Sequence, residues 1–218
     1  MLCDLRDVGG YLDKKHMSTK SPYASLADEW KGSKLTEQDR KKWNERYSTN
    51  IGNQEPSETI LKYVSLAPIG NALDIACGNG RNSRFLARKG FQVDAVDISD
   101  IALNQFTDDD THINVICQDI DTLQIPENRY QLIVNIRFLD RRLFPMIKNG
   151  LKPGGVLIFE SFIDEEKDYC LKSNELLHAF NSFRVVYYEE RENEPSEKFD
   201  QSAYFVGIKS STLKNTNH

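Results

Sequence analysis

Hydrophobic residues occur in short runs that predict buried strands alternating with helices, and residues 71–97 carry the clearest example. Residues 72–76 and 91–96 are largely apolar and too short for typical helices, which favours buried parallel strands. Residues 82–89 between them carry an apolar stripe and stop at a glycine, as expected for a helix. We therefore predict a strand, a glycine loop, a helix and a second strand that ends at Asp97.

The same alternation continues along the chain. Helices are predicted after the capping residues Thr36, Ser57, Ser99 and Ser173, over residues 37–47, 58–67, 100–106 and 174–180, with one more after the fourth strand. Further strands are predicted at residues 113–117, 130–136, 156–162, 183–188 and 203–209, and a turn at residues 151–155. In the second helix, Ile60, Leu61 and Val64 are expected to face inward. The last two strands are joined by a short charged loop, which fits an antiparallel hairpin.

The glycine loop is the first candidate for chemistry. Gly78 and Gly80 lack a Cβ, so the backbone can turn tightly and approach a ligand. In open α/β sheets, ligands bind at the carboxyl ends of strands, and an acid such as Asp97 can accept both ribose hydroxyls there. A dinucleotide fingerprint expects a third glycine where this chain has Ser83. Asp74 would repel a pyrophosphate but suits an ammonium group. S-adenosylmethionine has an ammonium, a ribose and no phosphate, so it is favoured over a dinucleotide or a loop that binds nothing.

The segment ALDIACGNGRNS at residues 72–83 resembles the first motif of class I S-adenosylmethionine-dependent methyltransferases, and Asp97 matches their second. Together with W-N-E-R-Y at residues 43–47 and K-P-G-G-V-L-I-F-E-S-F at residues 152–162, it is similar to the small bacterial TehB-like, tellurite-resistance-related group. The resemblance covers about residues 36–209. It implies an α/β fold with a Rossmann-like, doubly wound, seven-stranded sheet, mostly parallel with the last strand antiparallel, and helices on both faces. It also implies S-adenosyl-L-methionine as cofactor and S-adenosyl-L-homocysteine as product.

The resemblance, read with the loop chemistry, assigns fifteen residues to cofactor binding. They are Trp43, Arg46, Tyr47, Asp74, Ala76, Cys77, Gly78, Asn79, Gly80, Asp97, Ile98, Asp119, Ile120, Asn135 and Arg137. The helix with Trp43 and Tyr47 is expected either to dock by its aromatic residues or to cover the methionine end, where Arg46 would meet the cofactor carboxylate. Asp119 and the Ile120 N–H are expected to bind adenine. The residues that follow the fourth strand would face the reacting methyl group.

The methyl acceptor is less well defined by the sequence. The chain has N-I-R-F at residues 135–138 where amino-group methylases carry N-P-P-Y, and no catalytic residue is assigned, although Glu160 and His178 are candidates. There is no long insertion to build a large substrate domain, so a small-molecule acceptor is favoured. A non-catalytic, cofactor-binding regulatory or assembly module on the same fold stays open as the alternative. An oligomeric state is not predicted.

Composition narrows the remaining classes. The 218 residues have a net charge of -5 and a pI of about 5.5, which argues against a nucleic-acid partner. The four cysteines form no C-x-x-C, which predicts small buried residues in a reducing cytoplasm, and the four histidines do not cluster, which predicts no metal site. No apolar run of about 18 residues and no signal peptide are recognised, which predicts no membrane association.

Asp108, Asp109 and Asp110 are interpreted as a solvated run. We assign residues 1–35 to a loosely ordered arm, 36–210 to one domain and 211–218 to a polar tail, and Met17 is left open as an alternative start.

Overall fold

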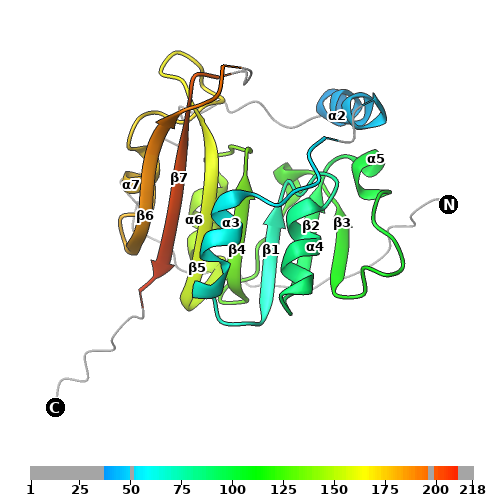
Figure 1. Ribbon diagram of the computed structural model, residues 1–218, viewed down its shortest axis with the longest axis horizontal. Helices are drawn as coiled ribbons and strands as arrows, with labels where there is room; N and C mark the ends of the chain where they lie inside the picture. Colours follow the sequence, from blue (N-terminus) through cyan, green and yellow to red (C-terminus); the bar gives the residue numbers. More distant parts are fainter. Residues whose placement is uncertain (1–36, 50–51, 196–198, 211–218) are drawn as a thin grey trace, which may run out of the picture. The chain divides into compact units, whose positions relative to one another are not determined.

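The computed structural model describes residues 37–49, 52–195 and 199–210 (Figure 1). The predicted cap Thr36, the arm at residues 1–35, Met17 and the tail at residues 211–218 lie outside the described residues. The predicted helix at residues 37–47 is present as α2, which spans Glu37–Thr49.

One seven-stranded sheet organises the described chain, in the order β3-β2-β1-β4-β5-β7-β6. The strands are β1 (Asn71–Ile75), β2 (Gln92–Asp97), β3 (Ile113–Cys117), β4 (Tyr130–Ile136), β5 (Leu151–Ile163), β6 (Phe183–Glu192) and β7 (Gln201–Lys209). Pairs among the first five strands are parallel, whereas β7 is antiparallel to both β5 and β6. The predicted fold class and the reversed last strand are confirmed.

Helices cover both faces of this sheet, and Figure 1 shows α3 and α4 in front of it. The remaining helices are α3 (Glu58–Tyr63), the 3-10 turn η1 (Val64–Leu66), α4 (Arg81–Arg88), α5 (Asp100–Leu103), the 3-10 turn η2 (Ile120–Thr122), α6 (Leu143–Gly150) and α7 (Glu175–Ala179). One apolar layer contains Ile60 of α3 and Leu86 of α4, and the other contains Ile147 of α6 and Leu176 of α7. All four side chains are fully buried, so helices cover the sheet on both sides.

Four local predictions are wrong. Ser173 does not cap α7, because Asn174 precedes the helix in a left-handed conformation and the Ser173 hydroxyl donates to Glu190. The predicted helix at residues 100–106 stops at Leu103. The predicted helix at residues 58–67 tightens into a 3-10 turn after Tyr63, and Leu61 is 49% exposed. Ile60 and Val64 already provide the i, i+4 pair that faces the sheet, so Leu61 lies to one side of it.

The segment Leu151 to Gly155 is a distortion within β5 and not a turn that precedes it. Leu151 pairs with Tyr130, and the register then jumps so that Leu132 pairs with Val156. Four residues on one strand therefore face a single residue on the other, and Gly154 takes up the irregularity with φ of 78°.

The side-chain environments of Asp110 and Cys117 also differ from the sequence interpretation. Asp110 forms an ion pair with Arg84 at 3.2 Å and is mostly buried, so it does not belong to a solvated run. Cys117 is exposed because β3 is an edge strand, whereas Cys77 and Cys170 are buried as predicted.

Candidate active site

The glycine loop joins β1 to α4 in a conformation that needs its small residues. Ala76, Gly78 and Gly80 all have positive φ angles, of 54°, 56° and 80°. A Cβ on Gly78 would overlap the Tyr47 hydroxyl, and one on Gly80 would overlap the Phe106 ring. Side chains from distant parts of the chain therefore pack directly against the loop backbone, which glycine alone permits at these two positions.

Asp97 ties this loop to the next helix. Its Oδ2 accepts from the Gly78 N–H at 2.8 Å and its Oδ1 accepts from the Ser99 N–H at 2.8 Å. Burial raises the pKa of Asp97, while these two backbone donors act in the opposite direction. Each carboxylate oxygen has about two acceptor positions, so both can also take a hydrogen bond from a ligand. The carboxylate is thus held at the end of β2 in a defined orientation.

Asp74 is more deeply buried, with 1% of its surface exposed. Its Oδ2 accepts from the Ser83 hydroxyl at 2.6 Å, so the side chain lies against the first turn of α4. Burial raises the pKa of Asp74 to about 7, and the negative charge of Asp97 adds to this effect, whereas the Ser83 hydrogen bond and Arg81 lower it. A positively charged ligand at the loop would favour the ionised form of this carboxyl group.

Helix α2 reaches the loop through Tyr47 and is anchored through Asn44. The Asn44 side chain donates to Asp100 at 2.7 Å and accepts from the Ser99 hydroxyl at 2.7 Å. Burial, followed by the charge of Asp97, raises the pKa of Tyr47 to about 12, so its hydroxyl stays protonated. No residue of α2 is fully buried, and the helix is docked both by the polar contacts of Asn44 and by the half-buried Tyr47.

The other two residues predicted on α2 stack on one another. The Arg46 guanidinium lies 5.4 Å from the centre of the Trp43 ring, and the Trp43 and Tyr47 ring centres are 6.3 Å apart. Arg46 is exposed. Sequence reasoning missed Asn44, although it stands inside the same W-N-E-R-Y segment, because a single asparagine carries no periodic signal.

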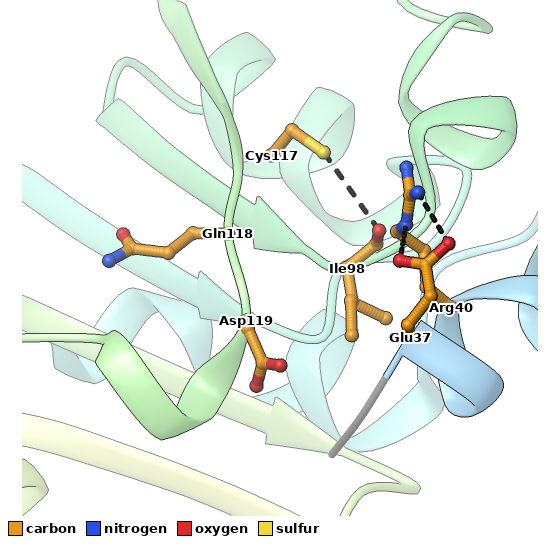
Figure 2. Close-up of a pocket in the computed structure, with 6 residues that line it drawn as sticks. All are labelled: Glu37, Arg40, Ile98, Cys117, Gln118 and Asp119. Atoms are coloured by element: carbon orange, nitrogen blue, oxygen red, sulfur yellow. Dashed lines mark hydrogen bonds and ion pairs between the residues drawn. The ribbon is translucent and has the colours of Figure 1, made fainter. Parts of the chain in front are cut away.

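A cavity of about 210 Å³ opens at the ends of β2 and β3, beside the first turn of α2. Figure 2 shows its lining side chains, which are Glu37, Arg40, Ile98, Cys117, Gln118 and Asp119. Asp119 also caps η2, because its Oδ1 accepts from the Asp121 N–H at 2.8 Å. The structure therefore brings two of the predicted residues, Ile98 and Asp119, to one cavity. The Ile120 side chain is buried in the core, and the role predicted for its backbone N–H stays a prediction.

The ends of β4 and β5 form the next part of this edge. Asn135 is 1% exposed, and its side-chain N–H donates to the Phe138 carbonyl at 2.6 Å. Its Oδ1 is buried and has no hydrogen-bond partner among the described residues. Glu160 is also buried and accepts from the Ser57 hydroxyl, and the Ser57 N–H in turn donates to Asn82 at 3.0 Å. Buried polar side chains therefore lie next to one another at the carboxyl ends of β4 and β5.

Comparison with known proteins identifies the family. A model described as a methyltransferase domain matches residues 72–155. The chain is 36% identical over 186 residues to a ubiquinone biosynthesis O-methyltransferase of Coxiella burnetii, covering 78% of this chain and 71% of that protein. This chain is a class I S-adenosylmethionine-dependent methyltransferase. It is also 26% identical over 143 residues to a malonyl-[acyl-carrier protein] O-methyltransferase of Ilyobacter polytropus, with 57% of this chain and 55% of that protein covered.

The solved structure of TehB from Haemophilus influenzae shows the same fold as this methyltransferase. The two superpose with a TM-score of 0.62 at 19% identity, over 77% of this chain and 67% of TehB. S-adenosylmethionine is the cofactor, and the dinucleotide alternative from the sequence is set aside. No described helix is both long and apolar enough to cross a membrane. Residues 37–49, 52–195 and 199–210 also contain no group of three side chains arranged to hold a metal ion.

Residues whose chemistry suits this cofactor follow one another along the sheet edge. Ile98 and Asp119 line the cavity at the ends of β2 and β3, and Asp97 lies at the end of β2. Asp74 is a buried carboxyl group, and a nearby ammonium would lower its raised pKa and favour the ionised form. Beyond the loop, the unpartnered Asn135 Oδ1 is an acceptor that needs a donor.

Proposed function

We propose that this methyltransferase transfers the methyl group to a small-molecule acceptor held at the carboxyl ends of β4 and β5. The observation that carries the proposal is spatial: polar side chains lie side by side at the carboxyl ends of neighbouring strands. They run from Asp119 and Asp97 to Asn135 and Glu160. The loops at β4 and β5 add no further domain among the described residues, which favours a small acceptor over a large one.

An oxygen acceptor has additional support. The two relatives named above are O-methyltransferases by name. The Asn135 Oδ1 is a buried acceptor that a hydroxyl group can satisfy by donating to it, and leaving such an atom without a partner costs about 1 to 3 kcal/mol. Binding a hydroxylated acceptor here would remove that cost. An amine could also donate to this oxygen, so the preference for a hydroxyl over an amine or a thiol rests on the names of these relatives.

The chain contributes mainly by alignment. When bound, S-adenosylmethionine supplies an activated methyl group, whose bond to sulfur breaks as the acceptor's lone pair bonds to the carbon, while sulfur keeps the released electron pair. Asp119 and Asp97 would hold the adenosyl part, and Tyr47 would cover the glycine loop. Well-oriented reactants reach effective molarities of about 10⁵ to 10⁸ M, so positioning alone provides a large part of the rate.

The acceptor proton must also leave. A positioned general base adds about 10²- to 10⁴-fold to such a step. Glu160 is a buried carboxyl group at this edge and is oriented by the Ser57 hydroxyl. We propose it as the group that receives the proton, and the Glu160→Gln variant should bind S-adenosylmethionine normally but turn over at least a hundredfold more slowly.

The function is tested by measuring S-adenosyl-L-homocysteine formation with a panel of small hydroxyl, thiol, amine and carboxylic acid acceptors. Turnover with hydroxylated compounds, abolished in Glu160→Gln, is expected. Asp94→Asn is the control, because Asp94 is a buried acid of β2 whose partners Tyr130, Arg129 and Asn114 lie at the other end of the sheet. Tight cofactor binding with no turnover on the whole panel would instead support a non-catalytic binding module.

A further inference from the structure

We propose that Arg142 is a positioning residue for the cofactor, which holds η2 so that Asp119 meets the amino group of adenine. The proposal rests on the placement of the adenosyl part beside Asp119 given above, and it does not depend on the identity of the methyl acceptor. It adds a residue outside the lining of the cavity that determines how well the enzyme distinguishes adenine from a base without that amino group.

Asp119 both lines the cavity and precedes the turn η2 as its cap. Its Oδ1 accepts from the Asp121 N–H at 2.8 Å, and its carbonyl accepts from the Thr122 hydroxyl at 3.0 Å. The carboxylate is therefore tied to the turn that follows it. Ile120 and Leu123 bury their side chains in the apolar core. The orientation of the Asp119 carboxylate thus depends on how the whole turn is held.

Arg142 connects this turn to the segment between β4 and α6. Its Nη2 donates to Asp121 Oδ1 at 2.6 Å, and its Nε donates to the two Asp140 carboxylate oxygens at 2.9 and 3.1 Å. The hydrogen bond with Asp140 raises the pKa of Arg142 most, burial opposes this, and the hydrogen bond with Asp121 adds to the increase. A guanidinium suits this role, because its rigid fork of N–H groups can bind two carboxylates at once. Arg142 thereby joins η2 to a segment 21 positions further along the chain.

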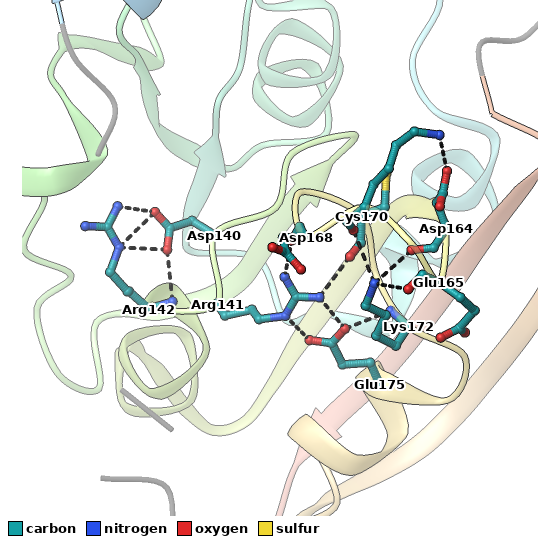
Figure 3. Close-up of polar contacts among 10 residues, drawn as sticks. Asp140, Arg141, Arg142, Asp164, Glu165, Asp168, Cys170, Lys172 and Glu175 are labelled. Atoms are coloured by element: carbon teal, nitrogen blue, oxygen red, sulfur yellow. Dashed lines mark hydrogen bonds and ion pairs between the residues drawn. The ribbon is translucent and has the colours of Figure 1, made fainter. Parts of the chain in front are cut away.

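The segment that carries Arg142 is itself fixed. Figure 3 shows Arg141 and Arg142 pointing in opposite directions, Arg142 with Asp140 and Arg141 toward Glu175. Arg141 donates to the Cys170 carbonyl at 2.8 Å and forms an ion pair with Glu175 at the start of α7. Residues that orient a binding group act well only when their own positions are locked by further contacts. Arg141 provides such contacts, so Arg142 can hold η2 in a defined position.

A carboxylate such as that of Asp119 can distinguish adenine from hypoxanthine. Adenine carries an amino group that donates to a carboxylate. Hypoxanthine carries a carbonyl oxygen at the same place, and a carboxylate, which only accepts hydrogen bonds, repels it. Hydrogen bonds weaken steeply when donor and acceptor are misaligned, so a small rotation of η2 would reduce this discrimination. Loss of the Arg142 guanidinium should therefore appear as lower selectivity for adenine.

The test is a calorimetric titration of the full chain with S-adenosyl-L-homocysteine and with S-inosyl-L-homocysteine, which carries hypoxanthine in place of adenine. We expect the adenine compound to bind at least tenfold more tightly, and Asp119→Asn to remove most of this preference. Arg142→Gln should reduce the preference at least threefold. Arg142→Lys should retain more of it, because a lysine keeps the charge without the fork of N–H groups. A double variant with Arg142→Gln and Asp119→Asn should lose no more than Asp119→Asn alone, since both residues act on one contact.

Arg129→Gln is the matched control. The Arg129 side chain is 47% exposed and pairs at 3.0 Å with Asp94, which is 11% exposed. Arg142 is similar, at 43%, and its partner Asp140 is also 11% exposed. Arg129 precedes β4, at the opposite end of the sheet from the cavity. The control variant removes one charge and breaks a comparable ion pair, so it should lower the melting temperature about as much as Arg142→Gln but leave the preference for adenine unchanged.

The proposal is overturned if the unmodified protein binds both compounds equally, if the preference survives in full in Arg142→Gln, or if Arg129→Gln reduces it as much. Losses that add in the double variant would also overturn it, because they would show that Arg142 does not act through Asp119. None of these results bears on the methyl acceptor, since the titrations contain none. Absence of turnover across the acceptor panel would remove the proposed function and leave the selectivity result standing.

Discussion

The hydroxyl of Tyr47 lies 2.3 Å from the position that a Cβ on Gly78 would occupy, which is too close for any real side chain. This contact joins α2 to the loop after β1, two segments about thirty residues apart in the chain. It explains why the first glycine of the loop is needed in this protein. The space beside its Cα belongs to another helix, and its φ of 56° is one that other residues rarely adopt.

Gly78→Ala should therefore disturb the site more than a positive φ alone would. Left-handed backbone costs about 1 to 2 kcal/mol for a residue with a Cβ, and displacing Tyr47 adds to this. We expect S-adenosylmethionine affinity, measured by calorimetry, to fall at least tenfold. Gly154→Ala is the control, since Gly154 has φ of 78° but nothing near its Cβ position. Adding Tyr47→Phe to Gly78→Ala should restore part of the affinity, and a double variant no better than the single one would contradict the steric account.

Asp97→Ala should weaken S-adenosylmethionine binding at least tenfold while the fold survives. Hydrogen bonds to a charged group contribute roughly 1.5 to 3 kcal/mol each, and the proposed site gives Asp97 two to the ribose. The change also frees the Gly78 and Ser99 N–H groups, so the melting temperature should fall as well. Asp94→Ala, measured in parallel, should lower the melting temperature but leave cofactor affinity within about twofold. Equal affinity losses in the two variants would show that Asp97 acts only through stability.

The pKa of Asp74 makes both stability and cofactor binding depend on pH. The folded-state pKa of about 7 lies above the usual value of 3.8, so the folded protein binds more protons than the unfolded chain between these values. Stability contributed by Asp74 is therefore present at low pH and lost as the pH rises through 7, by about 4 kcal/mol over the whole window. Asp74→Asn should thus gain stability relative to the unmodified protein between pH 5 and pH 8 in thermal melts.

Cofactor affinity should change in the opposite sense. Between pH 5.5 and pH 7, more of the Asp74 carboxyl ionises, and its attraction for the methionine ammonium grows. Affinity should rise with pH in the unmodified protein, and it should be weaker and nearly constant in Asp74→Asn. Parallel pH profiles for the two proteins would mean that Asp74 does not sense the cofactor.

Asn44→Ala should loosen α2 without unfolding the domain. The substitution removes the hydrogen bonds to Asp100 and from Ser99, and leaves the Arg40–Asp100 ion pair and the packing of Tyr47 on Gly78 to hold α2. We expect S-adenosylmethionine to dissociate several-fold faster in stopped-flow measurements, with the melting temperature nearly unchanged. Glu45→Ala, an exposed change on the same helix, should have little effect on either quantity. A large drop in melting temperature for Asn44→Ala would instead assign α2 to the stable core.

Local pattern by itself determined the strands and helices that carry the site. β3 and β4 have the predicted bounds, although only β4 is buried, and Ser57 and Ser99 cap α3 and α5. Strand propensity and helix capping depend on neighbours a few residues away. The glycines, Asp74 and Asp97 were likewise recognisable from their spacing around β1 and β2.

Tertiary structure alone decided which side chains meet. Asn44 bonds Ser99 across 55 positions, Ser57 bonds Glu160 across 103, and Arg137 lies over a phenylalanine from the next strand of the sheet. Ser173 follows the helix-cap pattern, but its hydroxyl bonds to Glu190 on β6. Such contacts depend on strand order and on how segments distant in the chain pack. A local pattern carries no information about either. The hydrogen-bond partner that a polar side chain finds, and so its contribution to stability, depends on which groups the fold places within hydrogen-bonding distance.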